Sequence, residues 1–307
     1  MITYQQLSKR PSTFRAMTGM TVQEFDRLYE QVFQRYEEAE EERQNRPERK
    51  RQGGAGHPYT NSLRERLLMT LIWLRVYPSQ EMLGLLFSLH KSNVGRNLKE
   101  MMDILVEVSE GEITWPVDKR RHQQMAEIMT EFPDVQAIID ATEQAIRRPH
   151  DQNTQKMHYS GKKKRHTLKT QIVVAPDGLI REVSDSVAGS VHDLTLLRQT
   201  HTLDRLAEGE AAMLDAGYQG VRQDAPDRSL YHPYRASRGH PLSEEQKAAN
   251  RVLSRYRIVV EHTLAQLKRF QVLAQVYRHS RALYNLIFRI VAGLINRRIA
   301  ACPLAAA

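Results

Sequence analysis

Three acidic residues that are far apart in the chain have the right types for metal-dependent phosphoryl chemistry. Residues 135–140 and 210–215 are apolar runs that end in Asp140 and Asp215, and Glu261 lies in a later helical segment. If both runs are strands, the aspartates lie where the chain leaves the sheet, which is where ligands bind in open α/β sheets. Taken singly, either aspartate is explained as well by a helix cap or a turn.

Taken together, the three carboxylates predict a site for two Mg²⁺ or Mn²⁺ ions. Hard oxygen ligands suit these metals, and two ions stabilise the attacking and leaving oxygens of an in-line phosphoryl displacement. Carboxylates this close would not all ionise without a metal to compensate their charge. For Glu261, an ion pair with Arg257, one helical turn earlier, is the structural alternative.

A concentrated basic patch lies between the first two acids. One interpretation is a solvated loop. Beside a metal cluster on the same domain, the patch also suits the phosphates of a nucleic-acid strand, and we favour this interpretation. The patch consists of Arg147, Arg148, Lys156, Lys162, Lys163, Lys164, Arg165 and Lys169.

The whole chain is basic, with 45 Lys and Arg against 36 Asp and Glu over 307 residues, a net charge of +9. That excess favours a polyanionic partner, although many basic proteins bind none. The single cysteine, Cys302, excludes a disulfide framework within the chain and fits a reducing cytoplasm. The sequence has no signal-peptide profile and no apolar stretch of ~18 residues, so we expect a soluble cytoplasmic protein.

The first third of the chain has the periodicity of helices. A capping-box pattern at Thr21 opens a helix over residues 21–44. Residues 61–106 predict further helices, and two of these, 80–87 and a helix opened by Ser92, have the layout of a helix-turn-helix unit. Its second helix would offer polar groups to phosphates and base edges, namely Lys91, Asn93, Arg96 and Asn97.

Residues 45–58 are rich in Gly, Pro and Arg and form the clearest linker. Two interpretations of this segment are open. It is either a flexible connector or a basic arm that binds phosphates or a minor groove.

From about residue 135 the pattern changes to strands alternating with helices. Strands over 167–174 and 179–187 flank a turn and form a β-hairpin. Residues 190–193 match a capping box that opens a short helix, and the chain from 244 onward is helical. These elements predict a mixed α/β sheet.

Five motifs that occur in order resemble the DDE transposases of bacterial insertion sequence 5-like elements and their eukaryotic PIF/Harbinger relatives. The motifs are Ile138-Ile-Asp-Ala-Thr142, Tyr159-Ser-Gly-Lys-Lys-Lys-Arg-His-Thr-Leu-Lys169, Gly189-Ser-Val-His-Asp193, Leu214-Asp-Ala-Gly-Tyr218, and Arg257-Ile-Val-Val-Glu261 with Lys268-Arg-Phe270. The preceding helix-turn-helix resembles the module that these proteins carry, so the resemblance spans roughly residues 20–275. One small departure is Ala141, where eukaryotic relatives usually have Gly.

The resemblance implies a fold of the α/β class, in which a ribonuclease-H-like mixed-sheet catalytic domain follows an all-helical helix-turn-helix domain. The matched catalytic acids and metal ligands are Asp140, Asp215 and Glu261, the matched auxiliary acid is Asp193, and the accompanying basic positions are Arg257 and Lys268. We expect Arg257 and Lys268 to be partners of phosphates or of the glutamate. The predicted domains are an N-terminal helix and basic linker (1–58), the helix-turn-helix domain (59–115), the catalytic domain (116–280) and a C-terminal helix (281–307).

The function that the resemblance implies is that of a transposase. It would cut DNA at the terminal inverted repeats of an insertion sequence and join the freed end to target DNA, with two Mg²⁺ or Mn²⁺ ions. Its partners would be double-stranded DNA and further copies of itself, with the helices at 21–44 and 281–300 as candidates for self-association. Its location would be the bacterial cytoplasm, at the nucleoid. Two alternatives are open: an endonuclease of the same fold that no longer transposes, and a non-catalytic DNA-binding regulator whose acids hold loops in place.

Overall fold

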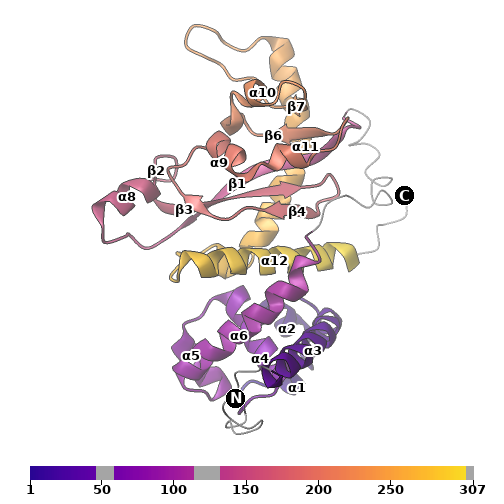
Figure 1. The fold of residues 1–307 in the computed structure, drawn as a ribbon, viewed down its shortest axis with the longest axis vertical. Helices are drawn as coiled ribbons and strands as arrows, with labels where there is room; N and C mark the ends of the chain where they lie inside the picture. Colours follow the sequence, from indigo (N-terminus) through magenta and orange to yellow (C-terminus); the bar gives the residue numbers. More distant parts are fainter. Residues whose placement is uncertain (46–58, 114–131, 302–307) are drawn as a thin grey trace.

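A helical body and a mixed sheet form the two ends of the molecule, and the last long helix lies between them (Figure 1). The computed structural model describes residues 1–45, 59–113 and 132–301. The predicted linker therefore lies outside the described residues, except for its first residue. Within the described ranges, no helix is long and apolar enough to span a membrane.

The helical body is built around α4, a helix that is buried from Arg66 to Leu74. Its described helices are α1 (Tyr4–Leu7), α2 (Pro11–Thr18), α3 (Val22–Gln44), α4 (Leu63–Val76), α5 (Gln80–Phe87) and α6 (Lys91–Glu110). The predicted capping box of α3 is confirmed, because Thr21 and Glu24 exchange both hydrogen bonds. Helix α4 is apolar on nearly every side and includes the buried Trp73, so the other helices pack around it.

Helices α5 and α6 form the predicted helix-turn-helix unit. The turn requires a glycine at Gly84, because a Cβ atom there would lie 2.4 Å from the carbonyl oxygen of Leu89. The prediction that Ser92 caps the second helix is wrong. The N-cap is His90, whose ring nitrogen Nδ1 accepts a hydrogen bond from the backbone N–H of Ser92, so α6 begins at Lys91.

The sheet has mixed strand directions, as predicted. In the order β2-β3-β1-β6-β7, β1 is antiparallel to β3 and parallel to β6, and β6 is parallel to β7. Two further short strands, β4 and β5, pair with β3 beyond the residues that pair with β2. The strands are β1 (Val135–Ala145), β2 (Tyr159–Ser160), β3 (Arg165–Val174), β4 (Ile180–Val183), β5 (Val187–Ala188), β6 (Ala211–Leu214) and β7 (Ser229–Tyr231).

The predicted hairpin is confirmed at its turn, where Gly178 has φ 86° and donates to the carbonyl oxygen of Ala175 at 2.9 Å. Its second strand is broken into β4 and β5 at Ser184. There the backbone N–H of Gln171 in β3 donates to the side-chain Oγ of Ser184 and not to a backbone carbonyl. The prediction that β1 ends at Asp140 is also wrong. The strand continues to Ala145 because its antiparallel partner β3 extends beyond the last residue of β6.

Helices cover both faces of the sheet. One face packs against α9 (Asp193–Thr200), the 3₁₀ turns η2 (Thr202–Arg205) and η3 (Ala216–Tyr218), and α10 (Val221–Asp224). The other face packs against α11 (Glu244–Lys268), η4 (Gln271–Leu273) and α12 (Arg281–Ala301), while α8 (Gln152–His158) lies beside β3. The described elements thus form an α/β fold with a helical N-terminal region, which confirms the predicted fold class.

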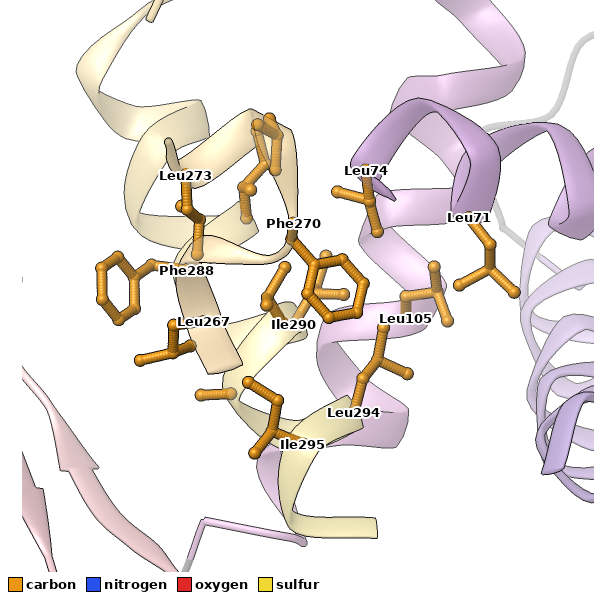
Figure 2. Close-up of a cluster of buried hydrophobic side chains, with 14 of the residues drawn as sticks. Leu71, Leu74, Leu105, Leu267, Phe270, Leu273, Phe288, Ile290, Leu294 and Ile295 are labelled. Atoms are coloured by element: carbon orange, nitrogen blue, oxygen red, sulfur yellow. The ribbon is translucent and has the colours of Figure 1, made fainter. Parts of the chain in front are cut away.

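Helix α12 joins the sheet to the helical body. Its apolar residues pack in one cluster with side chains of α4, α6 and the end of α11 (Figure 2). Gly293 allows the close approach to α6, because a Cβ atom there would lie 2.6 Å from Cβ of Ser109. Ten residues of α12 between Tyr284 and Asn296 are buried in the folded chain, and a role of this helix in self-association stays a prediction.

Candidate active site

Two aspartates lie side by side on neighbouring parallel segments, Asp140 within β1 and Asp215 directly after β6. Ile139 of β1 is in register with Leu214 of β6, so Asp140 and Asp215 follow at equivalent positions. Adjacent strands are about 4.8 Å apart, which brings the two carboxylates within reach of one ligand. In both, Oδ1 accepts the backbone N–H of the next residue at 2.7 Å, so the two side chains are held in the same way.

An arginine from α11 bridges the two carboxylates. The Nη1 atom of Arg257 lies 2.8 Å from Oδ1 of Asp215, and its Nη2 atom lies 3.9 Å from Oδ2 of Asp140. The side chain is 13 % exposed, and its buried Nε has no hydrogen-bond partner among the described residues. The alternative of an ion pair between Arg257 and Glu261 is therefore not realised, because the guanidinium reaches across to the sheet.

The site has more negative than positive charge. The pKa of Asp140 is raised to about 6: burial contributes most and the nearby carboxylates of Asp215 and Asp193 add to it, while the Ala141 N–H and the charge of Arg257 act in the opposite direction. Burial and the same three carboxylates raise the pKa of the buried Tyr218. One arginine thus faces several acids in a poorly solvated position, which is a condition that a bound cation would relieve.

Glu261 lies on α11 one turn beyond Arg257, and side chains four positions apart share a helix face. It is exposed, and no hydrogen bond or ion pair joins it to another described residue. Among the described residues, no group of three or more His, Cys, Asp or Glu side chains is arranged to hold a metal ion. The structure therefore brings together two of the three predicted ligands, and the complete trio stays a prediction.

Asp193 lies at the start of α9, beside the same site. The predicted capping box of residues 190–193 is wrong, because the N-cap is His192, whose Nδ1 accepts the Leu194 N–H. Asp193 instead pairs with Lys169, which donates to Oδ1 at 2.7 Å. Lys169 is only 7 % exposed, so it is an internal cation and not the surface phosphate contact that we expected.

A basic hollow lies next to the aspartates. Its lining includes Lys163 from the turn before β3, Arg165 from the start of β3, and Lys268 from the end of α11. Burial and the charge of Lys163 lower the pKa of Lys268, whereas Asp140 and Glu143 raise it. Lys268 is thus close both to another cation and to the acidic site. The lysines Lys162 and Lys164 of the same turn are exposed, as predicted.

Sequence reasoning overlooked Glu143 as a member of this region. Its carboxylate accepts from Thr167 at 2.8 Å and lies 3.8 Å from the ammonium of Lys169. It was missed because the strand was predicted to end at Asp140, three residues before Glu143.

The predicted DNA-contacting residues of α6 have different positions. Lys91, Asn93 and Arg96 are exposed near the start of the helix, and the Nζ of Lys91 lies 3.5 Å from Oε2 of Glu81. Asn97 is buried, and its Oδ1 accepts from Nε of Arg66 at 2.6 Å. Asn97 therefore holds the helical body together and is not on the surface, in contrast to our expectation.

A helix-turn-helix unit followed by a mixed sheet with paired aspartates defines a class of DNA-processing enzymes. The chain belongs to the DDE superfamily endonucleases: that family's model matches residues 139–296, and the model for the helix-turn-helix of the DDE superfamily endonucleases matches residues 62–110. The resemblance inferred from the motifs is thereby confirmed, as is the prediction of an enzyme that binds DNA and depends on divalent metal.

The chain is also similar over nearly its whole length to a curated protein. It is 28% identical over 298 residues to the "Probable transposase for insertion sequence element IS702" of Microchaete diplosiphon. The aligned residues cover 96% of this chain and 97% of that protein. No solved structure matches the chain.

Proposed function

We propose that this protein is a transposase that cuts DNA at the ends of an insertion sequence and joins them to target DNA. The observation that carries the proposal is the pair Asp140 and Asp215, held at equivalent positions on parallel strands and bridged by Arg257. Glu261 follows Arg257 by one turn on the same helix and would complete the ligand set.

The residues present fit divalent metal ions of the Mg²⁺ or Mn²⁺ type. The donors are carboxylate oxygens, which these hard cations prefer, and burial makes ionised Asp140 unfavourable without added positive charge. Asp140, Asp215 and Glu261 would hold these ions, which would supply an activated water and stabilise the negative charge on the attacking and leaving oxygens. On this proposal Arg257 moves from the carboxylates towards a phosphate, and Glu261 turns into the space that it leaves.

The basic hollow supplies the contacts for the substrate strand. Lys163, Arg165 and Lys268 line this hollow together with a single acid, Glu143, and Lys268 is also close to Asp140. Three cations that share one acid have an excess of positive charge, which suits a phosphodiester backbone. These residues would therefore orient the DNA so that a scissile phosphate reaches the acids.

Recognition of the ends would fall to the helix-turn-helix unit. The exposed Lys91, Asn93 and Arg96 lie near the N-terminus of α6, which is the part of a recognition helix that contacts base edges. Because two ends must be brought together, we also propose that the protein works as a dimer or higher assembly on DNA.

The test is metal-dependent cleavage and joining of DNA that carries the element's own ends. We expect Asp140→Asn, Asp215→Asn and Glu261→Gln each to lower cleavage by about 10³-fold or more, while leaving DNA binding intact. Asp204→Asn, which removes a carboxylate that is exposed and outside the site, is the matched control. Cutting without joining would identify the endonuclease alternative, and retained cutting by Asp215→Asn would contradict the proposed site.

A further inference from the structure

A buried ion-pair network lies beneath the turn that carries the second aspartate. The Nζ atom of Lys169 donates to the carbonyl oxygen of Val191 at 2.6 Å and to Oδ1 of Asp193 at 2.7 Å. It also lies 3.8 Å from Oε1 of Glu143, which stands opposite Lys169 in the register of β1 and β3. The side chains of Lys169 and Glu143 are less than 10 % exposed, so this ammonium serves only internal partners.

The second oxygen of Asp193 touches the turn after Asp215. A Cβ atom on Gly217 would lie 2.5 Å from Oδ2 of Asp193, well inside van der Waals contact. Gly217 is in η3, only two residues beyond Asp215. The carboxylate of Asp193 thus occupies the space in which any other residue at 217 would have a side chain.

A second close approach fixes the path of the chain to Asp193. A Cβ atom on Gly189 would lie 1.9 Å from Oγ1 of Thr167, and the N–H of Gly189 donates to the Thr167 carbonyl oxygen at 3.0 Å. The absence of a side chain at Gly189 therefore lets residues 189–193 pack directly against β3. This packing places the carbonyl of Val191 and the carboxylate of Asp193 within hydrogen-bond distance of Lys169.

Two simpler roles for Asp193 do not account for these contacts. It does not cap α9, because His192 does. A role as a direct metal ligand is opposed by Lys169, whose ammonium already donates to Oδ1 of Asp193 at 2.7 Å. Its two oxygens are used instead on Lys169 and against Gly217.

We propose that Asp193 is a positioning residue for the second aspartate. Lys169 fixes its carboxylate, and the carboxylate in turn fixes the turn at Gly217, so that Asp215 stays in register with Asp140. This inference rests on the proposed function, in which Asp215 is a metal ligand. Residues that orient metal ligands from behind commonly change metal affinity 10- to 100-fold when they are replaced.

The test is a double-mutant cycle read out as the binding of Mn²⁺ alone to the full chain by titration calorimetry. We expect Asp193→Ala to weaken Mn²⁺ binding about tenfold, and Gly217→Ala to weaken it at least as much through its clash with Oδ2. The double variant should bind no worse than Asp193→Ala, because the clash disappears with the carboxylate. Asp193→Asn keeps an acceptor for Lys169 and should restore most of the affinity.

Controls separate this effect from unfolding. Gly111→Ala places a Cβ atom where nothing lies within 4 Å, and it should leave both Mn²⁺ binding and the circular dichroism spectrum unchanged. Every variant is first checked for native dichroism, and Asp193→Asn provides the measurement if Asp193→Ala does not fold.

The possible failures are distinguishable. If the wild-type chain binds no Mn²⁺, both the proposed function and this inference are contradicted. If the wild type binds Mn²⁺ but Asp193→Ala binds it equally well, or if the two substitutions act independently, only the positioning role is overturned. An Asp193→Asn variant as weak as Asp193→Ala would instead assign Asp193 as a direct ligand.

Discussion

Each half of the molecule contains an arginine with little exposure to solvent, and these two residues have opposite surroundings. Arg66 of α4 is 1 % exposed, donates to Asn97 at 2.6 Å, and also bonds Glu100. Its guanidinium lies 3.8 Å from the ring centroid of Tyr59. Arg257, by contrast, faces two carboxylates with a contact of 2.8 Å and another of 3.9 Å, and its Nε is unpaired among the described residues.

The pKa values of the acids beside the two arginines are shifted in opposite directions. Burial alone would raise the pKa of Glu100, but hydrogen bonds from Tyr59 and Arg43 and the charge of Arg66 outweigh it, so its pKa is lowered. For Asp140, burial dominates and its pKa is raised to about 6. A fully paired network stabilises the fold, whereas an incompletely paired one marks a place where a ligand belongs.

The largest difference should appear when each arginine is removed. Arg66→Met leaves Glu100 without its buried partner and should lower the free energy of unfolding by about 3–5 kcal/mol. Arg257→Met should lower the free energy of unfolding by much less, because Asp140 and Asp215 keep some contact with solvent and Asp140 can take up a proton. Urea denaturation of both variants makes the comparison, and equal losses would remove the distinction between the two clusters.

The second difference concerns stability against pH. Between about pH 4 and 6 the folded state keeps a proton on Asp140 that the unfolded state has lost, so the stability contribution of this group falls as pH rises. Asp140→Asn should therefore be more stable than the wild type at pH 7, by up to about 3 kcal/mol, and equal to it at pH 4.

Glu100 should behave in the reverse sense. The pKa of Glu100 is lower in the folded state than its ordinary value of 4.5. Ionised Glu100 therefore stabilises the protein at pH values above 4.5, and this contribution is lost as the pH falls. Glu100→Gln should therefore lose stability at pH 7 and match the wild type in acid. Denaturation curves at several pH values would contradict the comparison if both substitutions shifted stability in the same direction.

The smallest expected effect is the response to metal. At a free Mn²⁺ concentration ten times its Kd, the wild-type chain should gain about 1.4 kcal/mol of stability. Arg66→Met should show the same gain, since its cluster has no part in the site, and Asp140→Asn should show little or none. Thermal denaturation with and without Mn²⁺ measures this, and a metal response that survives in Asp140→Asn would place the ion elsewhere.

Much of the local structure could be predicted because it depends on short-range chemistry. Thr21 and Glu24 cap α3 through groups three residues apart, and Gly178 permits the turn before β4. Where such predictions failed, a neighbouring group competed. His90 and His192 cap α6 and α9 in place of Ser92 and Ser190, because an imidazole nitrogen is also an acceptor for a helix N–H.

Residue type and periodicity along the chain are enough to predict the succession of helices and strands, the helix-turn-helix unit and the two aspartates that follow Ile139 and Leu214. Which charged groups are internal became known from the fold alone: Lys169 lies beneath the site, and Arg257 binds the aspartates of the sheet. Charge and spacing do not encode burial, which depends on how β1, β3 and α11 meet, and on contacts between residues far apart in the chain.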